Sequence, residues 1–379
     1  MFSKVRLHNF KSFRDLDYEA GMLNVLTGLN GSGKSSLLQG LLFLKTMTAK
    51  SEQAPWFVGL NGEDHSFGTY ADLHYAYSQS EDDCVRLGFE LDGIDGSFSF
   101  SLCDTVSNAD EVVVESEAGS VPHDIWQKVL EKIRNIQFVS AYRLPPQLEH
   151  IYSVTKVSHR AWGAMGEYAV GFLAQNGRSR IVDAKICHVS EPDAHLLSQV
   201  NAWMGVVSPG AQVTAEMLGK YNKALLSISF AKGVNHHAFL PQNVGFGISY
   251  VLPIVVMLLC AEPGNCLIIE NPEAHLHPRG QAELGRLISL VAARGVQIFV
   301  ESHSDHVLNG IRVAVKNGDI KPGLVNVSFF SRQEAVGANG EYEQESEVQT
   351  IRIALTGEFD RFPVGFMDEW NKQLLELLQ

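Results

Sequence analysis

The nine residues GLNGSGKSS, at positions 28 to 36, constrain this chain more than any other stretch. Gly28, Gly33, Lys34 and Ser35 fit the spacing G-x-x-x-x-G-K-[ST], after a predicted strand (MLNVLTG) and at the start of a predicted helix. Such a loop lets backbone N–H groups converge on phosphate oxygens, and the helix N-terminus adds partial positive charge. The pattern predicts a nucleoside triphosphate site, and the alternative is a chance glycine-rich turn.

Each residue of this loop has an expected role. Lys34 is expected to contact the β- and γ-phosphates, and Ser35 to supply a hydroxyl to Mg²⁺. Asn30, Gly31 and Ser36 belong to the same predicted nucleotide-binding set. The expected cofactors are therefore ATP and Mg²⁺.

Composition limits the class of protein. With 379 residues, 45% hydrophobic and 19% charged, the chain is typical of one large globular domain or two ordinary ones. A net charge of −13 argues against nucleic-acid binding over the whole surface, but not against a local basic strip or a protein partner. The five cysteines include no C-x-x-C pair, and the charged N-terminus does not resemble a signal peptide. The longest apolar run is shorter than the roughly 20 residues of a membrane span. We expect a cytoplasmic protein without a membrane partner.

Secondary-structure patterns divide the chain into three parts. Residues 1–54 carry the loop between strand-like and helical patterns, and residues 241–379 alternate buried strands with amphipathic helices. Because the buried apolar runs do not alternate with polar residues, they indicate a parallel sheet covered on both faces. Residues 55–240 include a predicted hairpin, at 84–103, and we expect them to form an inserted α+β lid.

Four motifs occur in a characteristic order: VRLHNFKSF with the loop, then VGFGISYVLP, then LIIENPEAHLHP, then FVESHSDH. In this order the chain resembles the RecF/SMC-type branch of the ABC ATPases. Within that branch it is similar to the bacterial AAA-type ATPases related to OLD (overcoming lysogenization defect) proteins. The ending EFDRFPVGFMDEWNKQLLELL resembles a short C-terminal domain of unknown function in one subgroup. The resemblance implies an α/β fold: an ABC-type (P-loop NTPase) head with a mostly parallel sheet flanked by helices.

The resemblance also implies a head-to-head dimer, with ATP between the phosphate loop of one subunit and a signature segment of the other. The matching segment here contains Gly245, Gly247 and Ser249. Its glycine-rich helix start is expected to contact phosphate through backbone amides. Alternatively, these glycines only permit close helix packing.

The stretch IIENPEAHLHP, at 268–278, places an acid where a buried strand ends. Glu270 is expected to hold Mg²⁺, directly or through water, at the sheet edge where ligands gather. Asn271 follows, where the family usually has its catalytic glutamate, and an amide can orient a water but cannot accept its proton. Glu273 is the nearest remaining carboxylate and the candidate general base; its alternative role is to cap the next helix.

A histidine follows the next predicted strand. By the resemblance, His303 is the switch histidine that senses or stabilises the γ-phosphate. An alternative use of nearby side chains is a separate transition-metal cluster. That cluster would draw on His275, His277, His306, Glu301 and Asp305.

Two basic residues have weaker signals. Lys11 precedes the strand of the loop, where the family places a basic residue near the nucleotide, although a solvated lysine fits equally. Arg143, in AYRLPP, has a position like that of the family's Gly-Pro-Leu-Arg segment, although the Gly-Pro is missing here; the contact expected from this position is phosphate or DNA. The glutamine of the loop that usually bridges sheet and lid is not apparent, and residues 67–73 are its expected place.

The main expectation is a dimeric, Mg²⁺-dependent ATPase that controls a separate effector protein, such as a nuclease, or DNA, with phage defence as the setting by family analogy. A second reading is an ATP-held switch that does not hydrolyse, because of Asn271. A third is a self-contained nuclease built on residues 270–306. An SMC-type DNA clamp is disfavoured by the acidic charge and the lack of a long heptad run. After the last motif-bearing region about 50 residues remain, fewer than a separate nuclease domain needs.

Overall fold

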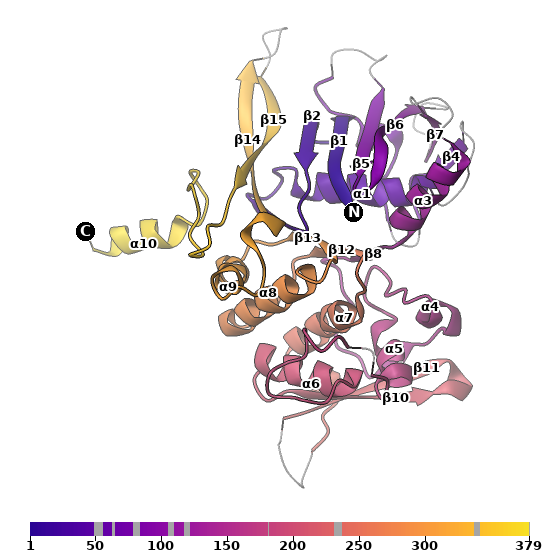
Figure 1. The fold of residues 1–379 in the computed structure, drawn as a ribbon, viewed down its shortest axis with the longest axis vertical. Coiled ribbons are helices and arrows are strands. Elements are labelled where there is room, and N and C mark those ends of the chain that lie inside the picture. Colours follow the sequence, from indigo (N-terminus) through magenta and orange to yellow (C-terminus); the bar gives the residue numbers. More distant parts are fainter. Residues whose placement is uncertain are drawn as a thin grey trace.

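A six-stranded, mostly parallel sheet lies at the centre of the molecule (Figure 1). Its order is β15-β14-β3-β13-β12-β8, and only β15 runs antiparallel to its neighbour. The strands are β3 (Leu23–Gly28), β8 (Ile136–Val139), β12 (Cys266–Glu270), β13 (Gln297–Glu301), β14 (Val325–Val336) and β15 (Tyr342–Ile351). The computed structural model describes residues 1–48, 56–62, 65–78, 84–104, 110–116, 122–180, 182–230, 237–336 and 342–378. The predicted α/β class is confirmed.

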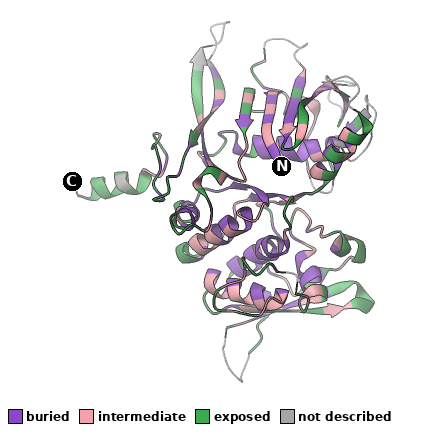
Figure 2. Cartoon of the chain, viewed as in Figure 1, coloured by how far each residue is buried: buried purple, intermediate pink, exposed green. Residues whose placement is uncertain are grey.

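The central strands are apolar because both faces of the sheet are covered. In β12, Leu267 and Ile269 enter one hydrophobic core, whereas Ile268 enters another. Helices on the first face are α7 (Phe246–Cys260), α8 (Pro278–Ala292) and α9 (Asp305–Lys316). Helices on the second face are α1 (Lys34–Thr48) and α3 (His123–Arg134). Figure 2 shows the strands and the inner sides of these helices as buried.

A second sheet of six antiparallel strands packs over α1 on the second face, in the order β2-β1-β5-β6-β7-β4. Its strands are β1 (Phe2–Phe10), β2 (Phe13–Glu19), β4 (Trp56–Gly59), β5 (Val85–Leu91), β6 (Ile94–Asp104) and β7 (Glu111–Ser116). The predicted hairpin is present as β5 and β6, which pair Val85 with Leu102.

Residues 55–240, expected as one inserted unit, are divided among three parts of the structure. Strands β4 to β7 belong to the same sheet as β1, and β8 is an edge strand of the central sheet. Helix α3 packs on α1. The physical reason is long-range pairing. Strand β1 pairs with β5 and β12 pairs with β8, although the partners are far apart in the chain, and no local sequence pattern indicates which strands will pair.

A smaller α+β unit remains below the helices of the first face (Figure 1). Its sheet has the order β10-β11-β9. Its strands and helices are β9 (Glu149–Ile151), β10 (Gln212–Leu218), β11 (Lys223–Ser229), α4 (Val154–Ser158), α5 (Ala169–Asn176) and α6 (Leu196–Val207). Helix α6 packs on α7 and α8, so this unit continues the first hydrophobic core.

The chain ends away from this body. After the β14–β15 hairpin it reaches α10 (Glu369–Leu377), which projects from the molecule and is exposed (Figures 1 and 2). The remaining short elements are α2 (Tyr70–Leu73) and the 3₁₀ turns η1 (Gly219–Tyr221), η2 (Pro241–Asn243) and η3 (Pro322–Leu324). Among the described residues, no helix has both the length and the apolar character to cross a bilayer.

Candidate nucleotide site

The loop between β3 and α1 depends on its glycines. Gly28, Gly31 and Gly33 have φ angles of +135°, +73° and +99°, which residues with a Cβ rarely adopt. A Cβ at Gly28 would also lie 2.0 Å from the Phe330 carbonyl oxygen of neighbouring β14. The glycine spacing of the sequence is therefore a backbone requirement of this loop.

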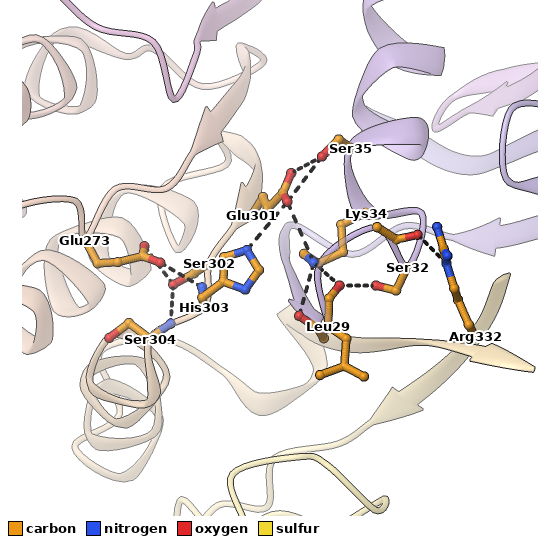
Figure 3. A network of polar contacts seen from close by, with 12 residues as sticks. Leu29, Ser32, Lys34, Ser35, Glu273, Glu301, Ser302, His303, Ser304 and Arg332 are labelled. Carbon is orange, nitrogen blue, oxygen red and sulfur yellow. Dashed lines mark hydrogen bonds and ion pairs between the residues drawn. The ribbon is translucent and has the colours of Figure 1, made fainter. Parts of the chain in front are cut away.

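Lys34 is folded back into the loop that it follows. Its side chain is 3% exposed, and its Nζ donates to the carbonyl oxygens of Gly28 (3.1 Å) and Leu29 (2.7 Å). The Oε1 of Glu301 lies 3.9 Å away (Figure 3). Burial lowers the pKa of Lys34, and the charge of Glu301 opposes that shift. The ammonium is thus held at the loop by carbonyl dipoles and one carboxylate.

The two serines after Lys34 point to different partners. Ser35 Oγ donates to the Glu301 carboxylate, at 2.9 Å from Oε2 and 3.3 Å from Oε1. Ser36 Oγ accepts from Ser12 Oγ at 3.1 Å. Asn30 is exposed at the tip of the loop. Ser35 is therefore the serine that meets an acid.

The sequence predicts Glu301 only as a member of a metal cluster, yet Glu301 is the acid that contacts Ser35 and Lys34 of the loop. Its strand, β13, pairs directly with β3, whereas β12 lies one strand further away. The side chain is 8% exposed and contacts both Ser35 and Lys34. A signal for it was available, because Glu301 ends a buried strand just as Glu270 does.

Glu270 ends β12, opposite Glu301 in the register of the two strands. Its Oε2 accepts from the Ala141 N–H at 2.9 Å. Burial raises the pKa of Glu270; the nearby Glu301 carboxylate adds to this rise, whereas the Ala141 N–H and Arg143 oppose it. The two strand ends thus bring a half-buried carboxylate, Glu270, and a buried one, Glu301, to the same edge of the sheet.

Arg143 fixes the backbone at the end of β12. Its guanidinium donates to the carbonyl oxygens of Ser140 (3.0 Å), Glu270 (2.8 Å) and Asn271 (2.6 Å). The guanidinium carbon lies 5.5 Å from the centre of the Tyr250 ring. Burial lowers the pKa of Arg143 to about 10, with nearby carboxylates opposing. In this arrangement its donors are directed at protein carbonyls.

Asn271 has a left-handed backbone, with φ +43°. Asparagine adopts this conformation more readily than glutamate does. Its N–H donates to the Glu301 carbonyl oxygen at 2.9 Å. Its Oδ1 is buried and has no hydrogen-bond partner within the described part of the chain. Backbone geometry thus gives a reason for an asparagine here.

Glu273 bonds to the turn after β13. Its Oε1 accepts from the His303 N–H at 2.7 Å, and its Oε2 accepts from Ser302 Oγ at 2.9 Å (Figure 3). The residue that caps α8 is His277, whose Nδ1 accepts from the Arg279 N–H. The expected alternative, that Glu273 caps this helix, therefore does not apply.

His303 lies between two carboxylates. Its ring Nε2 is 4.0 Å from Glu301 Oε1, and its backbone N–H bonds to Glu273 on the other side (Figure 3). The side chain is 38% exposed. Behind it, Ser304 caps α9 by accepting from the N–H groups of His306 and Val307. The histidine is therefore placed at the edge of the site on a fixed turn.

The signature segment presents only part of itself at the surface. Gly247 is buried, and a Cβ there would lie 2.5 Å from the His275 carbonyl oxygen. Ser249 is also buried, and its Oγ has no hydrogen-bond partner among the described residues. Gly245, the N-cap of α7, and Phe246 are exposed. Gly247 thus has the packing role that was the alternative, and Gly245 is the signature glycine that faces outward.

Lys11 and residues 67–73 come together next to the loop. The Lys11 N–H donates to the Leu73 carbonyl oxygen at 2.7 Å. Burial lowers the pKa of Lys11, against the charge of Asp72. Ser12, which follows, contacts Ser36 of α1. The segment expected to bridge sheet and lid therefore contacts the start of the chain beside the phosphate loop.

The separate transition-metal cluster does not form. In the described residues, which include all five candidates, no three or more His, Cys, Asp or Glu side chains are grouped to hold a metal ion. The ring of His275 instead packs against Phe246 and Tyr250, with centroid distances of 5.6 and 4.8 Å.

Two protein families match parts of this sequence. A family described as "AAA domain, putative AbiEii toxin, Type IV TA system" matches residues 211–309, and one described as "AAA domain" matches residues 4–139. No protein with a curated description matches the sequence.

Solved structures of Smc heads have the same fold. One is an Smc head bound to the C-winged helix domain of ScpA, with 11% identity and a TM-score of 0.51, covering 92% of this chain and 98% of that one. Another is an Smc head with an extended coiled coil, bound to the C-terminal domain of ScpA, from Pyrococcus furiosus. It has 12% identity and a TM-score of 0.51, covering 100% of this chain and 99% of that one. The P-loop NTPase fold of the SMC-head type, expected from the motifs, is confirmed.

Proposed function

We propose that this chain, which has an SMC-head ABC-type fold and AAA-domain sequence in both parts of its core, is a magnesium-dependent ATPase that dimerises around ATP. The observation that carries the proposal is the group formed by Lys34, Ser35 and Glu301 at the phosphate loop. A cation, a hydroxyl and a carboxylate at the N-terminus of a helix are the parts that bind a nucleoside triphosphate with its metal ion.

The residues present fit magnesium. Mg²⁺ binds through one or two carboxylates together with hydroxyl, water and phosphate oxygens. Ser35 supplies the hydroxyl, and Glu270, by the family pattern, or Glu301, by its contact with Ser35, supplies the carboxylate. When bound, the ion would neutralise negative charge on the phosphates.

This chain's own residues would bind the nucleotide and orient its phosphates. Lys34 would exchange its loop carbonyls for phosphate oxygens, while the loop N–H groups hold the phosphates. His303 would contact the γ-phosphate from the turn after β13. Glu273, which accepts the His303 N–H, is either the general base or a positioning residue for that histidine.

Dimerisation would use the exposed start of α7. Gly245, which N-caps this helix, and Phe246 are exposed, and the first N–H donors of a helix carry partial positive charge. ATP bound at the phosphate loop of a second subunit would accept hydrogen bonds from those donors. In this dimer contact, Lys11 and Ser36 would lie on the subunit that supplies the phosphate loop. Gly247 would pack behind the helix start on the other subunit.

The test of hydrolysis is phosphate release from ATP with Mg²⁺, with Lys34→Ala as blank. Turnover above the blank supports the proposal. Failure of the wild type to bind ATP at all refutes it. ATP binding with turnover equal to the blank favours the second candidate, an ATP-held switch, which the lack of a carboxylate at Asn271 supports.

The dimer has its own test. A Cβ at Gly245 meets nothing within 4 Å, so Gly245→Asp leaves the monomer intact while placing a negative charge where phosphate is expected. Gly323→Asp, in an equally open position on η3, is the matched control. Sedimentation velocity with ATP should show a dimer for the wild type and the control, but not for Gly245→Asp. A dimer that persists in Gly245→Asp argues against the ATP sandwich.

We extend the proposal to biological role on similarity alone. One matching family is described as a putative toxin of a toxin–antitoxin system, and the similar Smc heads are bound to ScpA domains. The corresponding role here is control of a separate effector protein or of DNA, in phage defence. Phage plating on cells that express the wild type or Lys34→Ala tests this role, and equal plating contradicts it.

A further inference from the structure

Two glutamates at strand ends, Glu270 and Glu301, are candidates for the magnesium ligand, and they differ in their surroundings. Glu301 sits on β13, whose Glu301 pairs with Leu26 of β3, two residues before Gly28. Glu270 sits on β12, which does not touch β3. Because β13 lies directly beside the loop-bearing strand, its terminal side chain reaches the start of α1.

The contacts of Glu301 are those of an acid built for this site. Its side chain is 8% exposed, it accepts from Ser35 Oγ at 2.9 Å, and Lys34 Nζ is 3.9 Å away. A buried carboxylate is costly unless it is paired. Lys34 and Ser35 supply that pairing, so both phosphate-loop side chains are engaged by the same acid.

The carboxylate of Glu270 is engaged elsewhere. It accepts from the Ala141 N–H, and Arg143 holds its backbone carbonyl. These bonds tie Glu270 to the turn after β8, on the side of β12 away from β3. Its position therefore suits a second, outer carboxylate better than a partner of Ser35.

We propose that Glu301 is the carboxylate that takes up the divalent cation together with Ser35, and that it restrains Lys34 until phosphate binds. The proposal rests on the proposed function, since it concerns the same nucleotide site. Binding of ATP draws Lys34 to the phosphates and leaves Glu301 without its cation. Glu301 would then hold the Mg²⁺ that accompanies ATP, and the charge of that ion would take the place of the Lys34 charge. Glu301 thus makes ATP binding dependent on magnesium.

This exchange predicts that one variant, Glu301→Gln, affects two ATP affinities differently: the affinity without metal and the affinity with Mg²⁺. Without Glu301, Lys34 is free of its carboxylate, and no negative charge faces the phosphates. Glu301→Gln should therefore bind metal-free ATP at least as tightly as the wild type does. It should also lose most of the affinity gained on adding Mg²⁺, on the order of 10-fold to 100-fold. A change of fold alone would weaken both affinities.

The experiment is calorimetric titration of ATP into the full-length protein, in EDTA and in Mg²⁺. Wild type, Glu301→Gln, Glu270→Gln and Lys34→Ala are compared. The electron paramagnetic resonance spectrum of Mn²⁺ with ATP provides a readout of the ion itself. We expect Glu301→Gln to lose both the Mn²⁺ signal and the Mg²⁺ gain while it retains metal-free binding, and Glu270→Gln to lose less of either.

Two outcomes overturn the proposal. One is a full Mg²⁺ gain in Glu301→Gln, whatever its turnover; the other is loss of the gain in Glu270→Gln alone. Failure of the proposed function looks different, because the wild type would then not bind ATP, or would bind it no better than Lys34→Ala does. Ser35→Ala is the control that distinguishes misfolding from loss of a metal ligand. It removes the hydroxyl partner of Glu301 and leaves Glu301 paired with Lys34.

Discussion

Strands β12 and β13 end alike in sequence but differ in what surrounds their ends. Each is buried, each ends on a glutamate, and Glu270 and Glu301 face each other in register. Glu301 contacts Ser35 and Lys34, whereas Glu270 accepts a backbone N–H from the turn after β8. The comparison teaches that a strand-end acid acquires its role from the neighbouring strand, since identical local patterns meet different partners.

The turns after the two strands are also joined. The Asn271 N–H donates to the Glu301 carbonyl oxygen, and Glu273 accepts from the His303 N–H and the Ser302 hydroxyl. The β12 end is held by Arg143 from its outer side. The site therefore consists of one strand end that contacts the loop and a second that supports it.

The strongest test of this comparison is turnover. Glu301→Gln should lower kcat for ATP by about 100-fold or more, because it removes a charge that acts on the transition state in a buried site. Glu270→Gln should lower it by less than about 10-fold, as expected for a supporting residue. The measurement is steady-state phosphate release at saturating ATP and Mg²⁺. Equal losses, or a larger loss in Glu270→Gln, would show that the two acids have been ranked the wrong way.

The next test breaks the support of the β12 end. Arg143→Met should lower the free energy of unfolding by about 3 kcal/mol, because three carbonyl oxygens lose their charged donor. Urea unfolding measures the change. Arg361→Met, at an exposed arginine paired with its neighbour Asp360, is the control and should change little. A loss below about 1 kcal/mol in Arg143→Met would contradict the assigned role.

A third test asks what Glu273 does between the two turns. The amide oxygen of Gln can still accept the His303 N–H, whereas Gln cannot take a proton from water. If Glu273 positions His303, Glu273→Gln should keep kcat within a few-fold and Glu273→Ala should lose about 10-fold or more. The measurement is kcat for both variants under the same conditions. Similar, severe losses in both would identify Glu273 as the general base.

The smallest expected effect concerns the backbone at Asn271. Because its φ is +43°, Asn271→Gly should be more stable than Asn271→Ala by about 1 kcal/mol. Asn309, within α9, is the matched control, where Ala should exceed Gly by about the same amount. Thermal or urea unfolding of the four variants gives both differences. The same sign at both positions would mean that residue 271 does not hold a left-handed backbone.

Local sequence patterns were sufficient where structure depends on local geometry. The glycines of 28–33, the helix after them, the buried strands and the β5–β6 hairpin all formed as expected. Their periodicity and turn residues act over a few positions. The lid boundary was not predictable in this way, because β5 pairs with β1 and β8 pairs with β12 across the sequence.

The same division applies to the site. The sequence by itself determined the phosphate loop, since the φ angles of Gly28, Gly31 and Gly33 exclude most other residues, and it placed an acid at the end of β12 and of β13. Only the tertiary structure decided which acid meets Ser35, that Glu273 bonds to the His303 turn, and that Gly247 is buried while Gly245 is exposed. The physical reason is that strand order and register are set by contacts between segments far apart in the chain. A local pattern specifies which side chains are available at a strand end, but the neighbouring strand specifies what they touch.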